Sequence, residues 1–535
     1  MSSVAQIKTK QASSKPDGEE RFDSKHRIDG TVTPELVIGL CGPLGTPLHR
    51  VAEFLESILS KNFEYRCNII KLSDFIKEYG NPEDPSAINS LIDAGNSLRD
   101  KHGPSVLAQL AIRKIASDRS APIKASSQEG ATTDLPESGA IVPTRVVRNC
   151  HIIDSIKNKN ELEMLRSVYG KLFHLVSVYS TIGLRLQNLE NRFGKIPAVY
   201  ELIDRDSGEE TKHGQSVRDI FPLADFFLKV EDNTDLNIES SLLRYINLLL
   251  GTKVITPTSG ERAMHAAYSA ARNSACLSRQ VGAAISDESG SVLSVGWNDV
   301  PRAFGGLYDF EGPMPGKTHG DHRCWNLDGG KCFNDLEKTE IARRLTVALE
   351  KEGIIEKKSI IEVQARLRGS SELKGLIEFS RAVHAEMHAL LNAGAANGSK
   401  IRGAKLYVTT YPCHSCARHI VAAGISEVRF IEPYRKSLAT RLHADAITES
   451  ESDTSKVRII PFDGVAPSQF IELFKEGAQG RKDKNGKMKL NNLSPLPVTA
   501  STLEAIETLE GLAIKELNSG GLLGDQGGGD VNEKS

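Results

Sequence analysis

Two short motifs, each at a point where a helix is expected to begin, constrain this chain more than any other feature. The first is His-Ala-Glu at 384–386, and the second is Pro-Cys-His-Ser-Cys at 412–416. Cys413 and Cys416 are one helical turn apart, so both thiols can point at the same spot, and the positive end of the helix dipole favours thiolates there. One predicted helix and one predicted strand separate the two motifs.

These residue types suit a catalytic zinc ion, which takes three protein ligands and keeps a fourth position for water. His384, Cys413 and Cys416 supply one imidazole and two thiolates. Glu386 is close enough in sequence to act as the proton shuttle without being a ligand. A Cys-x-x-Cys pair alone is also typical of a structural zinc knuckle or a redox pair, and a His-x-Glu alone indicates little. The combination favours a catalytic Zn²⁺.

Composition limits the setting in which such a site would work. Eight cysteines in 535 residues are too few for a disulfide scaffold. The chain shows neither a secretion signal nor a membrane span, so the sequence predicts a cytoplasmic protein with no membrane contact. The 67 basic and 69 acidic residues give a net charge of −2, which offers no bulk support for binding to a polyanion.

The length predicts two domains with terminal arms. Residues 1–30 are polar and predict a disordered arm. Residues 31–250 alternate short apolar runs with amphipathic segments, which predicts a parallel sheet with covered faces. Residues 257–476 predict the order helix, hairpin, helix, strand, helix, strand, strand, which implies a mixed sheet flanked by helices. Residues 477–535 predict a flexible C-terminal tail with one helical pattern at 503–517.

The first predicted strand runs into the Gly-rich stretch GLCGPLGTPLHR. The backbone N–H groups of such a turn can cradle phosphate, which makes Gly39, Gly42, Gly45 and Thr46 candidate nucleotide-binding residues. A P-loop has Gly-Lys-Ser/Thr at this turn, whereas Thr46 and Pro47 follow Gly45 here. The missing lysine disfavours phosphoryl transfer. Degenerate nucleotide binding and a purely scaffolding role remain as alternatives.

Residues 270–424 resemble the deoxycytidylate deaminase branch of the cytidine deaminase superfamily, through SRQVGAAI, GWNDVP, HAEMHAL and TTYPCHSCARHIVAAGISEV. With EPYRKSLATRLHADAI, PFDGVAPSQFIELF and the N-terminal domain, the chain is similar to bacterial anti-phage dCTP deaminases. This resemblance implies an α/β fold, with a P-loop-kinase-like parallel-sheet domain followed by a cytidine-deaminase-like α/β/α sandwich. It implies hydrolysis of the cytosine amine in free deoxycytidine nucleotides, dCTP or dCMP, which would drain dCTP in anti-phage defence.

The same resemblance implies further site residues. Asn298 matches an asparagine that contacts the deoxyribose in this family, although it also suits a turn before Pro301. Ser278 and Arg279 precede a predicted strand, and the guanidinium fork of Arg279 suits a phosphate. Tyr434 is a candidate to close over the base or the phosphates. Some deoxycytidylate deaminases carry an extra structural metal, which here would fall on His319, His322, Cys324 and Cys332.

Two other functions remain open from the sequence. A deaminase of cytosine or adenine in RNA or single-stranded DNA shares the zinc signature but needs a basic groove, which the charge balance does not favour. A nucleotide-sensing or RNA-sensing regulator would use the zinc domain as its effector. By analogy, the resemblance also implies a homo-oligomer, hexameric in related deaminases, and a silencing partner such as an inhibitory small RNA or an effector nucleotide.

Overall fold

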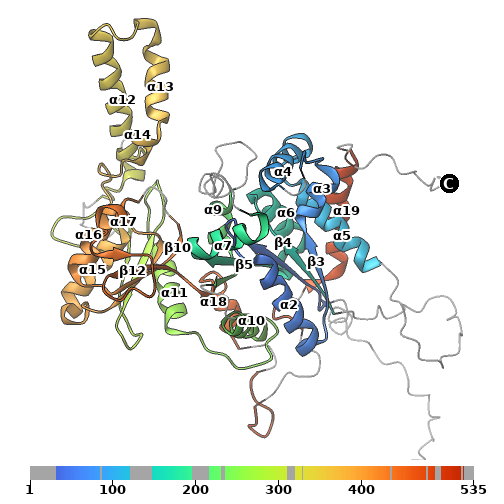
Figure 1. Cartoon of the computed structure of the whole chain (residues 1–535). Helices are drawn as coiled ribbons and strands as arrows, with labels where there is room; N and C mark the ends of the chain where they lie inside the picture. The colour runs from blue at the N-terminus through green and yellow to red at the C-terminus, as the bar shows by residue number, and fades with distance from the viewer. Residues whose placement is uncertain are drawn as a thin grey trace, which may run out of the picture.

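The computed structural model describes residues 32–84, 87–120, 148–194, 216–230, 235–309, 320–327, 329–433, 437–476, 480–488, 496–499, 501–519 and 522. These ranges form two units, each built on a six-stranded sheet with helices packed around it (Figure 1). The predicted α/β fold is confirmed. None of the helices in these ranges is both long enough and apolar enough to cross a bilayer.

The first sheet has the strand order β13-β6-β5-β2-β4-β3. Every neighbouring pair is parallel except β13 with β6. The residues of LVIGLC in β2 and of FHLVSVYS in β5 are almost all buried, as expected for strands that helices cover on both faces. The strands are β2 (Leu36–Cys41), β3 (Arg66–Lys71), β4 (Asn149–Asp154), β5 (Phe173–Ser180), β6 (Phe226–Val230) and β13 (Gly464–Val465).

Helices alternate with these strands along the chain, which is the pattern that the sequence predicts for residues 31–250. They are α2 (Leu48–Phe63), α3 (Leu72–Tyr79), α4 (Ile88–His102), α5 (Val106–Ser120), α6 (Lys159–Tyr169), α7 (Ile182–Phe193), α9 (Val217–Ile220) and α10 (Asp235–Leu249), with 3-10 turns η1 (Gly170–Leu172) and η2 (Phe221–Leu223). That this unit is P-loop-kinase-like stays a prediction.

The second sheet has the strand order β11-β12-β10-β9-β7-β8. β7 is antiparallel to both of its neighbours, and the remaining pairs are parallel. The elements are α11 (Ser259–Ala271), β7 (Gly282–Ser286), β8 (Val292–Trp297), α15 (Ala385–Asn397), η5 (Gly398–Lys400), β9 (Lys405–Thr410), α16 (His414–Ala423), β10 (Glu427–Glu432), α17 (Ala439–Leu442), β11 (Ile447–Thr448) and β12 (Val457–Pro461).

Alternation along β7 and β9 assigns the two faces of this sheet. Ala283 and Val408 belong to the core under α15 and α16, whereas Ala284 and Tyr407 belong to the core that includes α11 and extends into the first unit. The predicted mixed sheet between helical layers is therefore present. Because Gly296 of β8 has no side chain, the backbone of α15 can lie directly against that strand.

An insertion between β8 and α15 carries a helical hairpin that projects away from both sheets, at the upper left of Figure 1. Its helices are α12 (Phe333–Lys351), α13 (Ile360–Gly369) and α14 (Ser371–Gly375), with 3-10 turns η3 (Cys324–Asn326) and η4 (Lys357–Ser359). The element order predicted for residues 257–476 does not include this hairpin.

The C-terminal part of the chain returns to the first unit, which corrects two predicted boundaries. The second sheet ends with β12, after which β13 pairs with β6, so 257–476 is not a single separate domain. A flexible tail over all of 477–535 is also wrong, because α19 (Leu503–Ser519) buries Ile506 and Leu517 in the core of the first unit. β14 (Ser501–Thr502) pairs with β1 (Val32–Thr33), and α18 (Phe470–Phe474) packs on α10. The predicted arm at 1–30 lies outside the described residues.

Candidate metal centre and active site

The His-Ala-Glu motif lies at the start of α15. His384 is the N-cap residue, in an extended conformation, and Glu386 is in the first turn with only 4% of its surface exposed. A side chain at Gly296 would meet the backbone of Ala385 and Ala389, so the close approach of β8 fixes where this helix begins. Ser294 Oγ also donates to the carbonyl of Ala389, at 2.9 Å. Strand and helix together therefore position the motif.

The second motif lies where β9 leads into α16. Cys413 is the N-cap residue, and its Sγ accepts the backbone N–H of Cys416 at 3.4 Å. Such a contact, together with the positive end of the helix dipole, favours a thiolate at Cys413. Both cysteines are buried in the core under α15 and α16. The fold thus brings together two motifs that the sequence separates by a helix and a strand.

The three candidate ligands converge on one point. His384 Nδ1 lies 3.4 Å from Cys413 Sγ and 3.3 Å from Cys416 Sγ, and all three atoms are within 4.8 Å of one another. Ligands bound to a tetrahedral zinc, at about 2.3 Å for sulfur and about 2.0 Å for nitrogen, are roughly 3.5 Å apart. The donor atoms therefore fit zinc in both type and spacing, and in the described ranges no other His, Cys, Asp and Glu side chains group in this way.

Proton sharing within this cluster supports a metal-binding role. The hydrogen bond from Cys416 lowers the pKa of Cys413, and the same contact raises the pKa of the Cys416 thiol, as does burial. The hydrogen bond to Cys413 raises the pKa of His384 to about 9. The protons retained in this way are those that a divalent cation displaces when it binds, since thiolates and neutral imidazole are the ligating forms.

Glu386 lies beside the cluster without belonging to it. Its carboxyl contacts the thiol of Cys416, and burial raises the pKa of Glu386. A raised carboxyl pKa suits a group that both takes up and releases a proton during one turnover. This is the geometry expected of an acid–base residue next to three metal ligands.

Both polar atoms of the Asn298 side chain bond to the backbone of a neighbouring loop. Its Oδ1 accepts the backbone N–H of Val281 at 2.7 Å, and its Nδ2 donates to the carbonyl of Arg279 at 2.8 Å. The side chain is 7% exposed, so the amide holds the 279–281 backbone against the end of β8. Its predicted contact with the deoxyribose stays a prediction, and fixing this loop is the role that the structure shows.

The loop held by Asn298 carries the other predicted substrate residues. Arg279 forms an ion pair with Glu432 at 3.1 Å and keeps 46% of its side chain exposed. Ser278 Oγ lies 3.3 Å from Cys332 Sγ. Tyr434 lies outside the described residues. Glu432 could not be predicted from the sequence, because an acidic residue at the end of a strand belongs to no recognisable motif.

The Gly-rich stretch divides between strand and loop. Gly39 lies inside β2, where a side chain would overlap Ile156 and Phe173, so it serves packing, and its prediction as a nucleotide-binding residue is wrong. Gly42, Gly45 and Thr46 do lie in the turn before α2, and Gly45 has a φ of +85°.

Side chains from other elements hold this turn and leave a cavity beside it. Lys157 Nζ donates to the carbonyl of Gly42 at 2.9 Å, and Arg185 Nε donates to that of Leu44 at 2.7 Å. A cavity of about 440 Å³ lies next to the turn, and Lys71, Lys157 and Arg192 are among its lining residues. The turn therefore borders a basic cavity at the carboxyl edge of the first sheet.

The described residues of the predicted second metal site do not come together. His322, Cys324 and Cys332 do not form a group within 4.8 Å of one another, and His319 lies outside the described ranges. The neighbouring Arg323 instead pairs with Asp321 at 2.6 Å and with Asp299 at 3.4 Å. Asp299, which the sequence reasoning missed, is 1% exposed and accepts the backbone N–H of Ala275 at 3.0 Å.

Comparison with known proteins finds a family model that matches the part of the chain carrying this site. Residues 257–432 match the family model described as the cytidine and deoxycytidylate deaminase zinc-binding region. Deoxycytidylate deaminase of Enterobacteria phage T2 is 47% identical over 55 residues, which cover 10% of this chain and 29% of that protein. ComE operon protein 2 of Bacillus subtilis is 43% identical over 56 residues, again 10% of this chain and 29% of that protein. The chain thus matches less than a third of the length of these two curated relatives.

The solved structures with similarity include the dCMP deaminase of cyanophage S-TIM5 in complex with dCMP and dUMP, at 19% identity and a TM-score of 0.23, covering 39% of this chain and 99% of that one. Residues 257–432, which contain the His384, Cys413 and Cys416 group, therefore match a deaminase zinc-binding region. This match agrees with the deaminase family that the sequence motifs indicate.

Proposed function

We propose that this protein catalyses the zinc-dependent hydrolytic deamination of free deoxycytidine nucleotides, dCTP or dCMP, to the corresponding deoxyuridine nucleotides and ammonia. One observation carries the proposal. A buried carboxyl, Glu386, lies against a His384, Cys413 and Cys416 donor set that fits zinc, and Glu386 itself is not part of that set. Three ligands plus a free acid–base group are what hydrolysis of an aminopyrimidine needs.

Bound zinc would act as a Lewis acid that activates water for attack on C4 of the cytosine ring. Glu386 would take up the proton released from that water, protonate N3 of the ring and later supply a proton to the departing ammonia. Its burial keeps bulk water from competing for these transfers. His384 and the two cysteines hold their positions because each motif begins a helix packed on the same sheet.

Arg279 would bind the nucleotide, and Asn298 would hold the loop that carries Arg279. A guanidinium binds phosphate with two parallel hydrogen bonds, so Arg279 is suited to the phosphate nearest the sugar. It can do so only if its loop stays in place, and the amide of Asn298 bonds to that loop on either side of residue 280. Substrate phosphate would share Arg279 with Glu432 or take its place.

The direct test is ammonia release from dCTP, dCMP, CTP and single-stranded DNA, each incubated with the purified full-length protein. Release from the free deoxycytidine nucleotides supports the proposal. Release from the polynucleotide alone would instead establish the rival polynucleotide deaminase, and release from none would reject deaminase activity. Glu386→Gln, a nearly isosteric change, should keep the zinc content of the parent and lose turnover. Turnover near the parent rate in this variant would refute the proton-transfer role.

A second candidate function concerns the first unit. The basic cavity beside the Gly42–Thr46 turn favours binding of a nucleotide without its hydrolysis, because Lys71, Lys157 and Arg192 are cationic while the turn lacks the P-loop lysine. A titration of ATP and dCTP into full-length Glu386→Gln, with and without Lys71→Ala, tests this. Loss of one binding event in Lys71→Ala supports the role, and identical isotherms argue for a scaffold.

The biological role that we attach to this activity is depletion of dCTP during phage infection, with silencing by a small RNA, an effector nucleotide or assembly of several copies. Its support is the sequence resemblance to anti-phage dCTP deaminases. Light scattering of the purified protein checks the assembly. Measurement of dCTP in infected cells that carry the parent protein or Glu386→Gln checks the role, since only the parent should lower it.

A further inference from the structure

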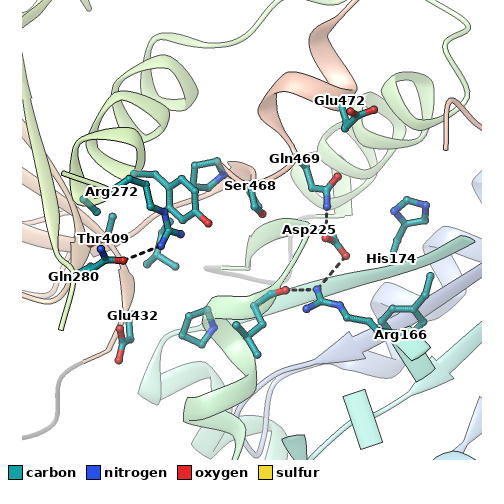
Figure 2. A pocket seen from close by; sticks show the side chains of 18 of the residues that line it. Arg166, His174, Asp225, Arg272, Gln280, Thr409, Glu432, Ser468, Gln469 and Glu472 are labelled. Carbon is teal, nitrogen blue, oxygen red and sulfur yellow. Dashed lines mark hydrogen bonds and ion pairs between the residues drawn. The ribbon is translucent and has the colours of Figure 1, made fainter. Parts of the chain in front are cut away.

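A large cavity lies between the two units, separate from the metal ligands (Figure 2). Its volume is about 660 Å³, within the range of pockets that hold small molecules. One wall comes from the first unit, at the amino end of β5 and at Asp225, and the other comes from α11 and the ends of β9 and β10. Thr410, which lines the cavity, ends β9 just before the turn that leads to Cys413. The cavity therefore opens at the same edge of the second sheet as the metal centre.

The rim of this cavity is the loop that would hold the substrate phosphate. Gln280, the neighbour of Arg279, lines the cavity and accepts a hydrogen bond from Arg272 at 3.2 Å. Glu432 also lines it, pairs with Arg279 and accepts a hydrogen bond from Thr410 Oγ1 at 3.3 Å. The left side of Figure 2 shows Arg272, Gln280, Thr409 and Glu432 together. A ligand held by Arg279 thus lies at the entrance to the cavity.

The acidic residues that line the cavity already have cationic partners. Asp225 accepts hydrogen bonds from the backbone N–H of Leu175 and from Gln469, both at 2.7 Å, and pairs with Arg166 at 3.6 Å. Glu472 pairs with Lys475 on the same helical turn, and Glu432 pairs with Arg279. These carboxylates are therefore already compensated.

Two cations of the cavity are not matched in this way. Arg272 lies over the ring of Tyr268, 4.5 Å from its centre, and bonds to Gln280, but makes no ion pair with a carboxylate in the described ranges. Lys171, on η1 across the cavity, likewise has no ion-pair partner in the described ranges. Its charge contributes to lowering the pKa of Glu472, but the two side chains form no ion pair. Uncompensated cations on both walls favour an anionic ligand that spans the space between them.

We infer that this cavity receives the outer phosphates of the substrate, so that the enzyme selects a nucleoside triphosphate over a monophosphate. The inference rests on the proposed deaminase function. The phosphate nearest the sugar would bind Arg279, and the following phosphates would extend past Gln280 to Arg272 and then to Lys171. A monophosphate ends at Arg279 and gains nothing from the two further cations. Arg272 and Lys171 are then the residues that determine specificity for phosphate number.

The test compares kcat/KM for dCTP and dCMP in Arg272→Ala, Lys171→Ala and the double variant. One charge-assisted contact to a phosphate corresponds to a loss of roughly ten- to a hundredfold. We expect a loss of that size for dCTP, mainly through KM, and no change for dCMP. Arg262→Ala, on the same helix α11, and Lys159→Ala, on α6, remove charges outside the cavity and should leave both values unchanged.

Equal losses for the two nucleotides, or no loss for either, would overturn the inference. Arg272→Lys keeps a charge at the site and should recover part of the dCTP preference, whereas a folding defect would depress both substrates and the melting temperature. The same variants in a Glu386→Gln background allow dCTP and dCMP binding to be measured by calorimetry without turnover. If the parent releases no ammonia, the proposed function fails. The phosphate inference then stands or falls on whether Arg272→Ala weakens binding of dCTP alone.

Discussion

Replacing Gly296 by alanine should disable the enzyme without touching a substrate or a metal ligand. The added Cβ would lie 2.3 Å from the backbone N of Ala389 and 2.4 Å from the carbonyl O of Ala385, whereas ordinary contact begins at 3.4 Å. Neither atom can rotate away, because both belong to the backbone of α15. The helix must therefore withdraw by about 1 Å, and overpacking of this kind costs about 1–3 kcal/mol of stability.

The same displacement moves His384 and Glu386, since both lie at the start of α15. A misplacement of about 1 Å can cost about a hundredfold in rate, so we expect kcat/KM to fall by about that factor while the protein stays folded. The assay is ammonia release from dCTP and dCMP, accompanied by the melting temperature and the zinc content.

Gly394→Ala is the matched control, because Gly394 lies on the same helix with nothing within 4 Å of an added Cβ. It should keep parental activity and raise helix stability by up to about 1 kcal/mol. Parental kcat/KM and an unchanged melting temperature in Gly296→Ala would refute the claim that the contact of β8 with α15 positions the site.

Three further predictions follow from particular contacts. Asn298→Asp keeps the acceptor for the backbone N–H of Val281 but loses the donor to the carbonyl of Arg279. KM should therefore rise by about tenfold, with a smaller change in kcat. An effect on kcat alone would contradict the loop-fixing role. Glu510→Ala removes the partner of Arg119 and Tyr169 and should lower the free energy of unfolding by about 1–3 kcal/mol in urea, whereas the exposed Glu507→Ala should not. Burial lowers the pKa of His174 below its ordinary value of 6.5, so the unfolded state takes up the proton first and stability should decline as pH falls below 6.5. His174→Gln should flatten that decline in urea melts at pH 5.5 and 7.5, and an unchanged slope would assign it to other groups.

The metal centre could be predicted from the sequence because its information is local. Each motif lies where a helix begins, and this can be read from the neighbouring residues. One imidazole and two thiols, from His384 and the two cysteines, are typical ligands of a single zinc ion. Most strands of the two sheets are likewise visible in the sequence as short apolar runs. Gly39 was misassigned because a glycine that removes a clash inside a strand looks the same in sequence as one that opens a turn.

What the sequence could not supply depends on contacts between distant segments. Nothing in the two residues of β13 indicates that they pair with β6, since that pairing joins positions 464 and 227. The docking of α19 depends on Glu510 meeting Arg119 and Tyr169, which are hundreds of residues away. The cavity between the units also depends on contacts between distant segments. Lys171 and Arg272 line the same cavity only because the two units pack against each other.

The account depends most on the identity and number of the metal ligands. X-ray absorption at the zinc edge of the purified full-length protein measures both directly. We predict one zinc per chain with two sulfur neighbours at about 2.3 Å and two nitrogen or oxygen neighbours at about 2.0–2.1 Å, that is, one imidazole and one exchangeable position. Four sulfur neighbours, or a zinc with none, would contradict a catalytic centre formed by His384, Cys413 and Cys416.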